Sequence, residues 1–384
     1  MFLTDPQLRA IIQFRRELHR CPEISGEERE TARAVSEKLR AAGADQVICG
    51  IGGHGVAAIF SGSEDGPTLM FRSELDALPI EEVSDLPYRS EVPGKGHLCG
   101  HDGHSSILVA VAMILGEKRP ARGRVVLLFQ PAEENGDGAV AVVADPIFAE
   151  LKPDLVFSLH NLPGIPLGHV ALREGPVTCA TRGMKITLSG KTAHASMPEQ
   201  GVPPTFAIAR LLTALTSLGR GDRVDEDFLR VTITHASLGE KAFGISPGQG
   251  EIWATLRSLT GDAMEQLMQA AERLVYDEAA AEGLTVAVSY HDVFEHCSNA
   301  AEPVSELSRA MADVGVPFDE GDGILPMRPG EDFGVFGVYA PSAMFFLGAG
   351  ETHPGLHNPD YDFPDDLIAV GSSIFVQTVR NILG

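Results

Sequence analysis

The segment SSILVAVAMILGEKRPARGRVVLLF, residues 105–129, carries the pattern that decides the fold class. Ser105–Leu115 is apolar over a length that suits a buried helix, and Val125–Phe129 is a short apolar run typical of a buried strand. A helix followed closely by a buried strand favours an α/β sheet with helices on its faces.

The same alternation extends on both sides of this segment. Asp5-Pro6 predicts a helix start with proline at the first helical position, and Ser25–Glu28 matches a capping box that would open a second helix. Further buried strands are expected at Val56–Phe60, Thr68–Phe71 and Leu155–Leu159. The N-terminal third therefore predicts an α/β domain whose sheet is flanked by helices.

The middle of the chain has a different order of elements. Strand, helix, strand, strand, helix and strand are expected in turn, which is the ferredoxin-like α+β pattern. These elements are Met184–Ser189, Pro203–Leu218, Leu229–Thr234, Ile252–Leu256, Ala263–Ala281 and Leu284–Tyr290. Because Phe345–Leu347 resumes the buried-strand pattern, we expect residues 179–292 to be an inserted satellite domain, with 1–178 and 293–384 forming the larger domain.

Composition excludes several classes of protein. The 384 residues are 44% hydrophobic and 22% charged, as in ordinary globular proteins. A net charge of −23 argues against nucleic acid or an anionic membrane as a partner. No apolar run reaches membrane-spanning length, no secretory signal pattern is present, and five cysteines are too few for a disulfide scaffold. A cytoplasmic location is therefore expected.

The segment HLCGHDGH, residues 97–104, indicates a metal site. It holds three histidines, one cysteine and one aspartate just before an apolar helix. Cys99 and His101 are two residues apart and can reach one metal region, because thiolate and imidazole are good ligands for zinc-like ions.

Three further polar segments follow predicted buried strands. They contain the adjacent carboxylates Glu133 and Glu134 and two His-Asn pairs that begin at His160 and His357. Ligands in open α/β sheets gather at the carboxyl ends of strands, and one of two adjacent carboxylates can bind metal while the other acts as a base. The candidate ligands exceed the number that one tetrahedral ion needs, which favours two metals that share ligands: Cys99, His101, Glu134, His160 and His357.

Two familiar motifs fail in their context. Gly50-x-Gly52-x-x-Gly55 matches a dinucleotide fingerprint, but a helix precedes it and a strand follows it, so a glycine turn is expected. Gly244-x-Ser246-x-Gly248 matches a nucleophile elbow, but Pro247 supplies no N–H for an oxyanion hole. A serine hydrolase is therefore rejected.

These polar segments together resemble the aminoacylase and carboxypeptidase-like zinc metallopeptidase family, in its amidohydrolase branch. That branch includes hippurate hydrolases and indole-acetyl-amino-acid hydrolases. The matching pieces run in family order from about residue 70 to about residue 365. They are RSELDALP at residues 72–79, HLCGHDGH, FQPAEE, LHNLPG, GKTAHASMP, Glu331-Asp332-Phe333 and LHNPDYDF.

The resemblance implies a function and a role for each candidate. It implies a metal-dependent amidohydrolase that cleaves N-acetyl, benzoyl or aryl-acyl amino acids, with Glu133 as general base for a metal-activated water. Asp76 is implied as the acid that orients a ligand behind the metals, His194 as the group that steadies the reacting carbonyl, and Arg257 as the substrate-carboxylate binder. The five ligand candidates would hold two divalent ions, zinc or manganese, with cobalt and nickel as further options. A homodimer through the satellite domain is implied as well.

The departures from the family pattern fall in the expected satellite domain. Gly244 and Gly248 stand where relatives often carry Asn and Asp, and Glu199 stands where many carry His. Thr192-Ala193 precede His194, where relatives usually have two glycines. By the resemblance, these positions lie in the domain that reads the ends of the substrate.

Two alternatives to an amidohydrolase stay open. One is a small-peptide hydrolase of the dipeptidase or carboxypeptidase type, although Cys99 favours the amidohydrolase branch because peptide-cleaving relatives generally have Asp-centred ligand sets. The other is a catalytically silent protein that binds a metal or a ligand.

Overall fold

The computed structural model describes residues 2–384, which fall into two compact units. Unit 1 comprises Met1–Val177, Cys297–Leu325 and Asp332–Gly384, and unit 2 comprises Thr178–His296 and Pro326–Glu331. The division expected from the sequence placed Pro326–Glu331 in the larger domain. The structure places this segment in unit 2 because its backbone bonds there, with Cys179 N donating to Met327 O at 3.1 Å.

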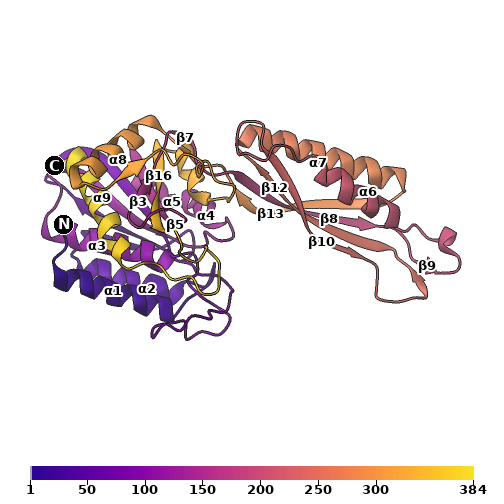
Figure 1. Ribbon diagram of the computed structural model, residues 1–384, viewed down its shortest axis with the longest axis horizontal. Helices are drawn as coiled ribbons and strands as arrows, with labels where there is room; N and C mark the ends of the chain where they lie inside the picture. The colour runs from indigo at the N-terminus through magenta and orange to yellow at the C-terminus, as the bar shows by residue number, and fades with distance from the viewer. Residues whose placement is uncertain (1) are drawn as a thin grey trace. The chain divides into compact units, whose positions relative to one another are not determined.

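Unit 1 is built on an eight-stranded mixed sheet with the order β1-β2-β4-β3-β5-β16-β6-β15 (Figure 1). The four central strands β4, β3, β5 and β16 are parallel, so their carboxyl ends meet at one edge. The strands are β1 Gln46–Ile51, β2 Gly55–Ser61, β3 Glu64–Glu74, β4 Arg122–Gln130, β5 Leu155–Pro163, β6 Val170–Ala171, β15 Phe318–Asp319 and β16 Ser342–Gly350. A short ladder joins β7 Gly175–Pro176 to β14 Ser298–Asn299.

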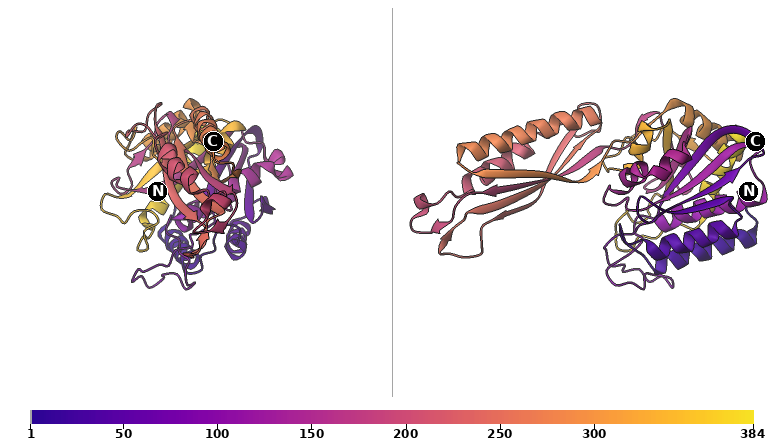
Figure 2. Two further views of the ribbon diagram at one scale, coloured as in Figure 1. Left: turned by 90° about the vertical axis from the view of Figure 1, so that its right-hand side faces the viewer. Right: turned by 180° about the vertical axis from the view of Figure 1, so that it is seen from behind.

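Helices pack on this sheet and on one another. α1 lies against α3, and α3 lies against α9 and β3; in Figures 1 and 2, α1 is indigo, α3 purple and α9 yellow. The helices are α1 Asp5–Arg20, α2 Arg29–Ala41, α3 His101–Glu117, α4 Gly138–Ala144, α5 Pro146–Leu151, α8 Ala301–Val314 and α9 Asp366–Leu383, with the 3-10 turn η2 Asp332–Val338. Every residue of α3 from His101 to Ala112 is buried, which explains why this helix is apolar on all sides.

The capping box expected at Ser25–Glu28 is wrong. The Ser25 hydroxyl donates to Asp76 at 2.7 Å rather than capping α2. The amide of Thr31, in the first turn of α2, donates instead to the Glu23 carboxylate at 2.8 Å. Helix α2 still starts near the expected residue. The Ser25 side chain, however, bonds to the distant Asp76 and not to the backbone of the helix.

Unit 2 contains a four-stranded antiparallel sheet with the order β10-β12-β8-β13 and two helices (Figure 1). Its elements are β8 Ala180–Ser189, α6 Thr205–Thr216, β10 Leu229–Leu238, β12 Gln249–Ser258, α7 Gly261–Ala281 and β13 Thr285–Phe294. Their order is ferredoxin-like. Met184, Ile186 and Leu188 alternate inward on β8 and bury against both helices. A small ladder pairs β9 Ala193–His194 with β11 Ile245–Ser246, and η1 spans Pro198–Gln200.

Within residues 2–384, the helices are all too short or too polar to span a lipid bilayer. Gly50, Gly52 and Gly55 lie at the turn between β1 and β2, with no helix after them.

Candidate metal centre

The parallel strands of unit 1 bring the predicted metal ligands to one edge of the sheet. Glu133 and Glu134 follow β4, His160 lies near the end of β5, and His357 follows β16. Cys99 and His101 come from the start of α3, which follows β3. Segments more than 250 residues apart in sequence therefore meet at the carboxyl ends of neighbouring strands, as ligand sites in open α/β sheets do.

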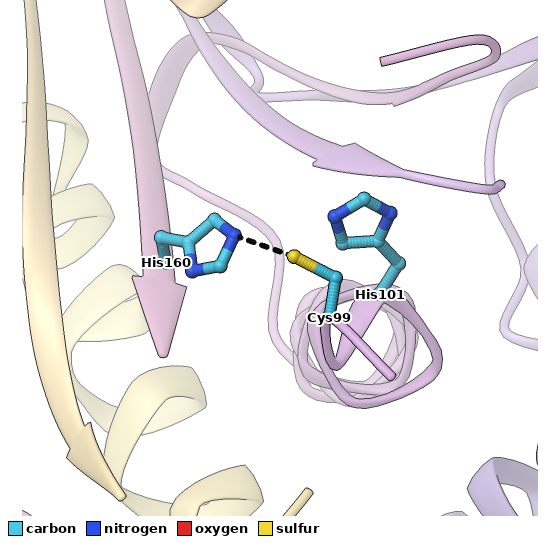
Figure 3. A group of neighbouring side chains, drawn as sticks. All are labelled: Cys99, His101 and His160. Atoms are coloured by element: carbon cyan, nitrogen blue, oxygen red, sulfur yellow. Dashed lines mark hydrogen bonds between the residues drawn. The ribbon is translucent and has the colours of Figure 1, made fainter. Parts of the chain in front are cut away.

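A first donor group consists of Cys99, His101 and His160, shown in Figure 3. Cys99 Sγ lies 3.4 Å from His160 Nε2, and one ligand atom from each of the three residues lies within 4.8 Å of the others. Figure 3 shows His160 pointing from β5 toward the start of α3, where Cys99 and His101 project. All three residues count as metal-binding candidates by the chemistry of their donor atoms.

Gly100 makes the turn between Cys99 and His101 possible. It adopts φ +89°, and a Cβ at this position would lie 2.4 Å from Asn161 Nδ2. Only glycine fits such a left-handed residue against a neighbouring side chain. The helix then begins at His101, earlier than the apolar run alone indicated.

A second donor group consists of Cys99, Glu134 and His357 and shares Cys99 with the first. His357 Nε2 lies 3.5 Å from Glu134 Oε2, and the His357 amide donates to Leu98 O at 2.8 Å. Glu133 and Glu134 also form a group with His101, whose Nε2 lies 3.8 Å from Glu133 Oε2 and 3.9 Å from Glu134 Oε1. The structure thus brings all five ligand candidates and Glu133 into one cluster.

The two buried histidines are oriented as metal ligands usually are. His101 Nδ1 donates to Asp76 O at 2.9 Å, and His160 Nδ1 donates to Asn161 O at 2.7 Å. Each ring therefore turns its Nε2 into the cluster. Among residues 2–384, His101 Nε2 is buried without a hydrogen-bond partner. A buried ring nitrogen without a hydrogen-bond partner, beside a thiol and carboxylates, fits a bound cation.

Protons can balance the charges of this cluster. Burial and the neighbouring Glu134 raise the pKa of the Cys99 thiol well above its usual value. Burial and a neighbouring histidine lower the pKa of His160 to about 3. Burial opposes a charged His101, but Asp76 and other nearby carboxylates raise its pKa to about 10. Because a metal binds thiolate and neutral imidazole, its binding would displace the protons of Cys99 and His101, whereas His160 is already neutral.

Asp76 contacts His101, with its Oδ1 3.4 Å from His101 Nδ1. It is fully buried and its Oδ2 accepts bonds from Ser25 Oγ at 2.7 Å and from the Glu134 amide at 2.9 Å. Burial opposes its charged form, yet contact with His101 lowers its pKa below the usual value. The carboxylate therefore stays ionised and fixes both a candidate ligand and the loop that carries Glu134.

A buried polar chain behind the cluster was missed by the sequence reasoning. Glu74 Oε2 lies 2.7 Å from His104 Nδ1, and His104 Nε2 accepts the Asn161 amide at 3.1 Å. Asn161 Nδ2 in turn donates to Cys99 O at 2.7 Å. Glu74 and His104 stand in the quoted motifs and form a donor group with His101. They differ from the ligand candidates in that Glu74 and His104 are bonded to each other and to the chain behind the cluster.

The chain continues through two oppositely charged residues. Arg72 contacts Glu74 and lies 2.5 Å from Asp332 Oδ1. Asp332 Oδ2 also accepts bonds from Gln130 Nε2 at 2.7 Å and from the Ala139 amide at 2.9 Å. All these side chains are buried, so each charge is matched by an opposite charge or a donor, as buried ions require.

His194 and Arg257 belong to unit 2, whereas the residues of the ligand cluster belong to unit 1. His194 is exposed on β9, and its Nδ1 lies 2.7 Å from Ser196 Oγ. Arg257 lies on β12, where its Nη1 donates to Thr181 Oγ1 at 2.9 Å and to Arg328 O at 2.8 Å.

The departures in unit 2 have partly visible reasons. A Cβ on Gly248 would lie 2.7 Å from Thr192 N, so an aspartate cannot stand there without a backbone shift. A Cβ on Gly244 would meet nothing within 4 Å. Glu199 is exposed in η1. Nothing in the structure explains why Gly244 and Glu199 differ from the family pattern.

Comparison with known proteins agrees with this geometry. Residues 70–381 match the model of peptidase family M20/M25/M40. The chain belongs to this family. An N-acetylcysteine deacetylase of Bacillus subtilis is 28% identical over 97% of both chains. Thermostable carboxypeptidase 1 of Saccharolobus solfataricus is 30% identical over 94% of this chain and 92% of that one.

A solved M20 structure supports a centre of two metals. This chain is similar to the crystal structure of a dinuclear metal binding peptidase of the M20 family from Bacillus subtilis. The two have a TM-score of 0.83 and 26% sequence identity, and the alignment covers 99% of each chain. The M20 chain described here is therefore a hydrolase, and its clustered ligand groups support two divalent metals.

Proposed function

We propose that this M20 chain is an amidohydrolase that cleaves the amide bond of N-acyl amino acids. The observation that carries the proposal is the cluster in which two donor groups share Cys99 while Glu133 lies beside them. The deacetylase relative supports an N-acyl amino acid as substrate. A thiol ligand supports the amidohydrolase branch over the small-peptide hydrolases.

Two divalent ions would be held by Cys99, His101, Glu134, His160 and His357. Thiolate and imidazole favour zinc, and the carboxylate also suits manganese. When bound, such ions polarise a water and an amide carbonyl and lower the pKa of that water toward about 7.

Glu133 would act as the general base. Its side chain is 8% exposed, and its Oε2 lies 3.8 Å from Nε2 of the candidate ligand His101. In the proposed reaction, its carboxylate accepts a proton from water and returns it to the leaving amine, because one group can serve as base and then as acid.

The substrate's two ends would be held by unit 2. His194 carries an exposed imidazole suited to steadying a reacting carbonyl, supplied by a partner subunit of a homodimer formed through unit 2. Arg257 would bind the substrate carboxylate, and its bonds to Thr181 and Arg328 hold the guanidinium in one orientation. We also propose that the enzyme acts in the cytoplasm.

A substrate panel tests the proposal. The protein is loaded with Zn²⁺ or Mn²⁺ and assayed on N-acetyl, benzoyl and indole-acetyl amino acids beside dipeptides. We expect Glu133→Gln to lower kcat by about 10²–10⁴-fold with unchanged metal content, and Glu351→Gln, at an exposed site, to change nothing.

Four outcomes would overturn it. Full activity after chelation, or in Glu133→Gln, contradicts the mechanism. Turnover of dipeptides alone would favour the peptidase type that the carboxypeptidase relative represents, and bound metal with no turnover on any substrate would support a silent binding protein.

A further inference from the structure

The loop that carries Glu133 contains a strained residue. It runs from Pro131 to Gly138 after β4, and Ala132 has φ +52°. A non-glycine residue in this left-handed region is strained, because its Cβ crowds the backbone. Such strain persists only where the surrounding structure imposes it, and it gathers at functional sites.

A carboxylate from a distant segment holds this residue. Glu28 Oε1 accepts the Ala132 amide at 2.8 Å and the Gly26 amide at 2.8 Å. The Glu28 side chain is fully buried, and its Oε2 has no hydrogen-bond partner among residues 2–384. Taking a carboxylate out of water is costly. Since the nearby Glu23 already serves α2, a cap for that helix does not account for burying Glu28.

The residue after Glu133 is held in the same manner. The Glu134 amide donates to Asp76 Oδ2 at 2.9 Å, and the same oxygen accepts the Ser25 hydroxyl at 2.7 Å. The amides on both sides of Glu133 therefore end on buried carboxylates. Both carboxylates are in turn bonded to the segment Ser25–Glu28 that precedes α2.

We propose that Glu28 is a positioning residue for Glu133: its carboxylate holds Ala132 in the left-handed conformation and thereby aims the Glu133 side chain into the ligand cluster. This inference rests on the proposed function. A base must sit within hydrogen-bond reach of its proton, and a misplacement of about 1 Å can cost about 100-fold in rate. The segment first expected to cap a helix instead supports the catalytic loop.

Substitutions at both ends of the bond test the proposal. Glu28→Ala removes the acceptor and should lower kcat by about 10–100-fold with KM and metal stoichiometry unchanged. Glu28→Gln keeps an acceptor oxygen and should stay near wild type. Ala132→Gly in the Glu28→Ala background should restore most of kcat, because glycine adopts positive φ without support. Glu27→Ala is the control, because Glu27 is the exposed neighbour of Glu28, and this variant should keep the wild-type kcat.

A measurement without metal or substrate tests the same bond. Hydrogen–deuterium exchange of the Pro131–Gly138 segment should speed up in Glu28→Ala and stay slow in Glu28→Gln and Glu27→Ala. If Glu28→Ala does not fold, Glu28→Asp replaces it in both experiments. The aspartate side chain is one methylene shorter, so its carboxylate is drawn back from the Ala132 amide.

The outcomes separate this proposal from the proposed function. An active wild type with an unchanged Glu28→Ala variant overturns the positioning role, and so does a loss that Ala132→Gly does not restore. Unchanged exchange in Glu28→Ala overturns it as well. Inactivity of the wild type on the whole panel contradicts the proposed function, while faster exchange in Glu28→Ala still supports the bond that holds the loop.

Discussion

His19 on α1 should make the stability of unit 1 depend on pH. Its ring is fully buried, with Nδ1 2.9 Å from Asp102 Oδ2 and Nε2 3.3 Å from Glu82 Oε2. Arg15 Nη1 lies 3.2 Å from the same Asp102 oxygen. Asp102 is in the first turn of α3, next to the candidate ligand His101, so this contact ties α1 to the helix that begins the metal centre.

The size of the effect follows from the pKa of His19. Burial opposes its charged form, but the bonds to Asp102 and Glu82 raise the pKa from 6.5 to about 9. At about 1.4 kcal/mol per unit, the shift corresponds to about 3 kcal/mol of stability. Because the folded pKa is raised, this contribution is fully present below about pH 6.5 and is lost as pH rises through about 9.

Urea unfolding of wild type and His19→Gln between about pH 6 and about pH 10 measures this effect. Circular dichroism is the suitable signal, because the single tryptophan, Trp253, lies in unit 2. The free-energy difference between the two proteins should be about 3 kcal/mol larger at the acidic end. His169→Gln, which removes an exposed pair with Asp319, is the control and should cost less than about 1 kcal/mol.

A difference between wild type and His19→Gln that stays constant over this pH range would refute the reasoning. A difference that grows toward alkaline pH would refute it too, because that sign requires a lowered pKa.

Three further predictions concern the metal centre. Asn161→Ala removes the bonds to Cys99 O and His104, so metal affinity should fall about 10–100-fold in a chelator competition; unchanged affinity would contradict this. Gly103→Ala places a Cβ 2.3 Å from the Phe363 ring, so the melting temperature should fall, and Phe363→Leu should restore part of it. Metal-free protein should lose activity in air through oxidation of Cys99, and reductant plus metal should restore it up to the sulfenic acid stage; a fully active Cys99→Ser variant would rule out Cys99 as a needed ligand.

Local patterns in the sequence sufficed for the main elements and for the ligand segments. Apolar periodicity predicted β2, β4, β5 and α3, because burial in an α/β sheet imposes that pattern over consecutive residues. Metal-type residues after predicted strands indicated where the ligands would meet, because parallel strands end at a common edge. The motif order also indicated the family, which the match over residues 70–381 shows.

Contacts between distant segments were beyond the reach of these patterns. Ser25 and Glu28 have the spacing of a capping box, yet they bond to Asp76 and Ala132. Nothing local marks Glu28 as buried, since a carboxylate is normally exposed and is buried only where donors are provided.

The sequence alone therefore determined the fold class, the order of elements and the residue types of the metal centre, because each depends on periodicity and on side-chain chemistry. The tertiary structure decided how those residues are held. The positive φ of Ala132, the two amides beside Glu133 and the buried chain from Asp332 to Asn161 all depend on donors and acceptors that only the folded chain brings within 3.1 Å or less. A hydrogen bond stabilises a buried group only at such range, and folding alone sets that distance.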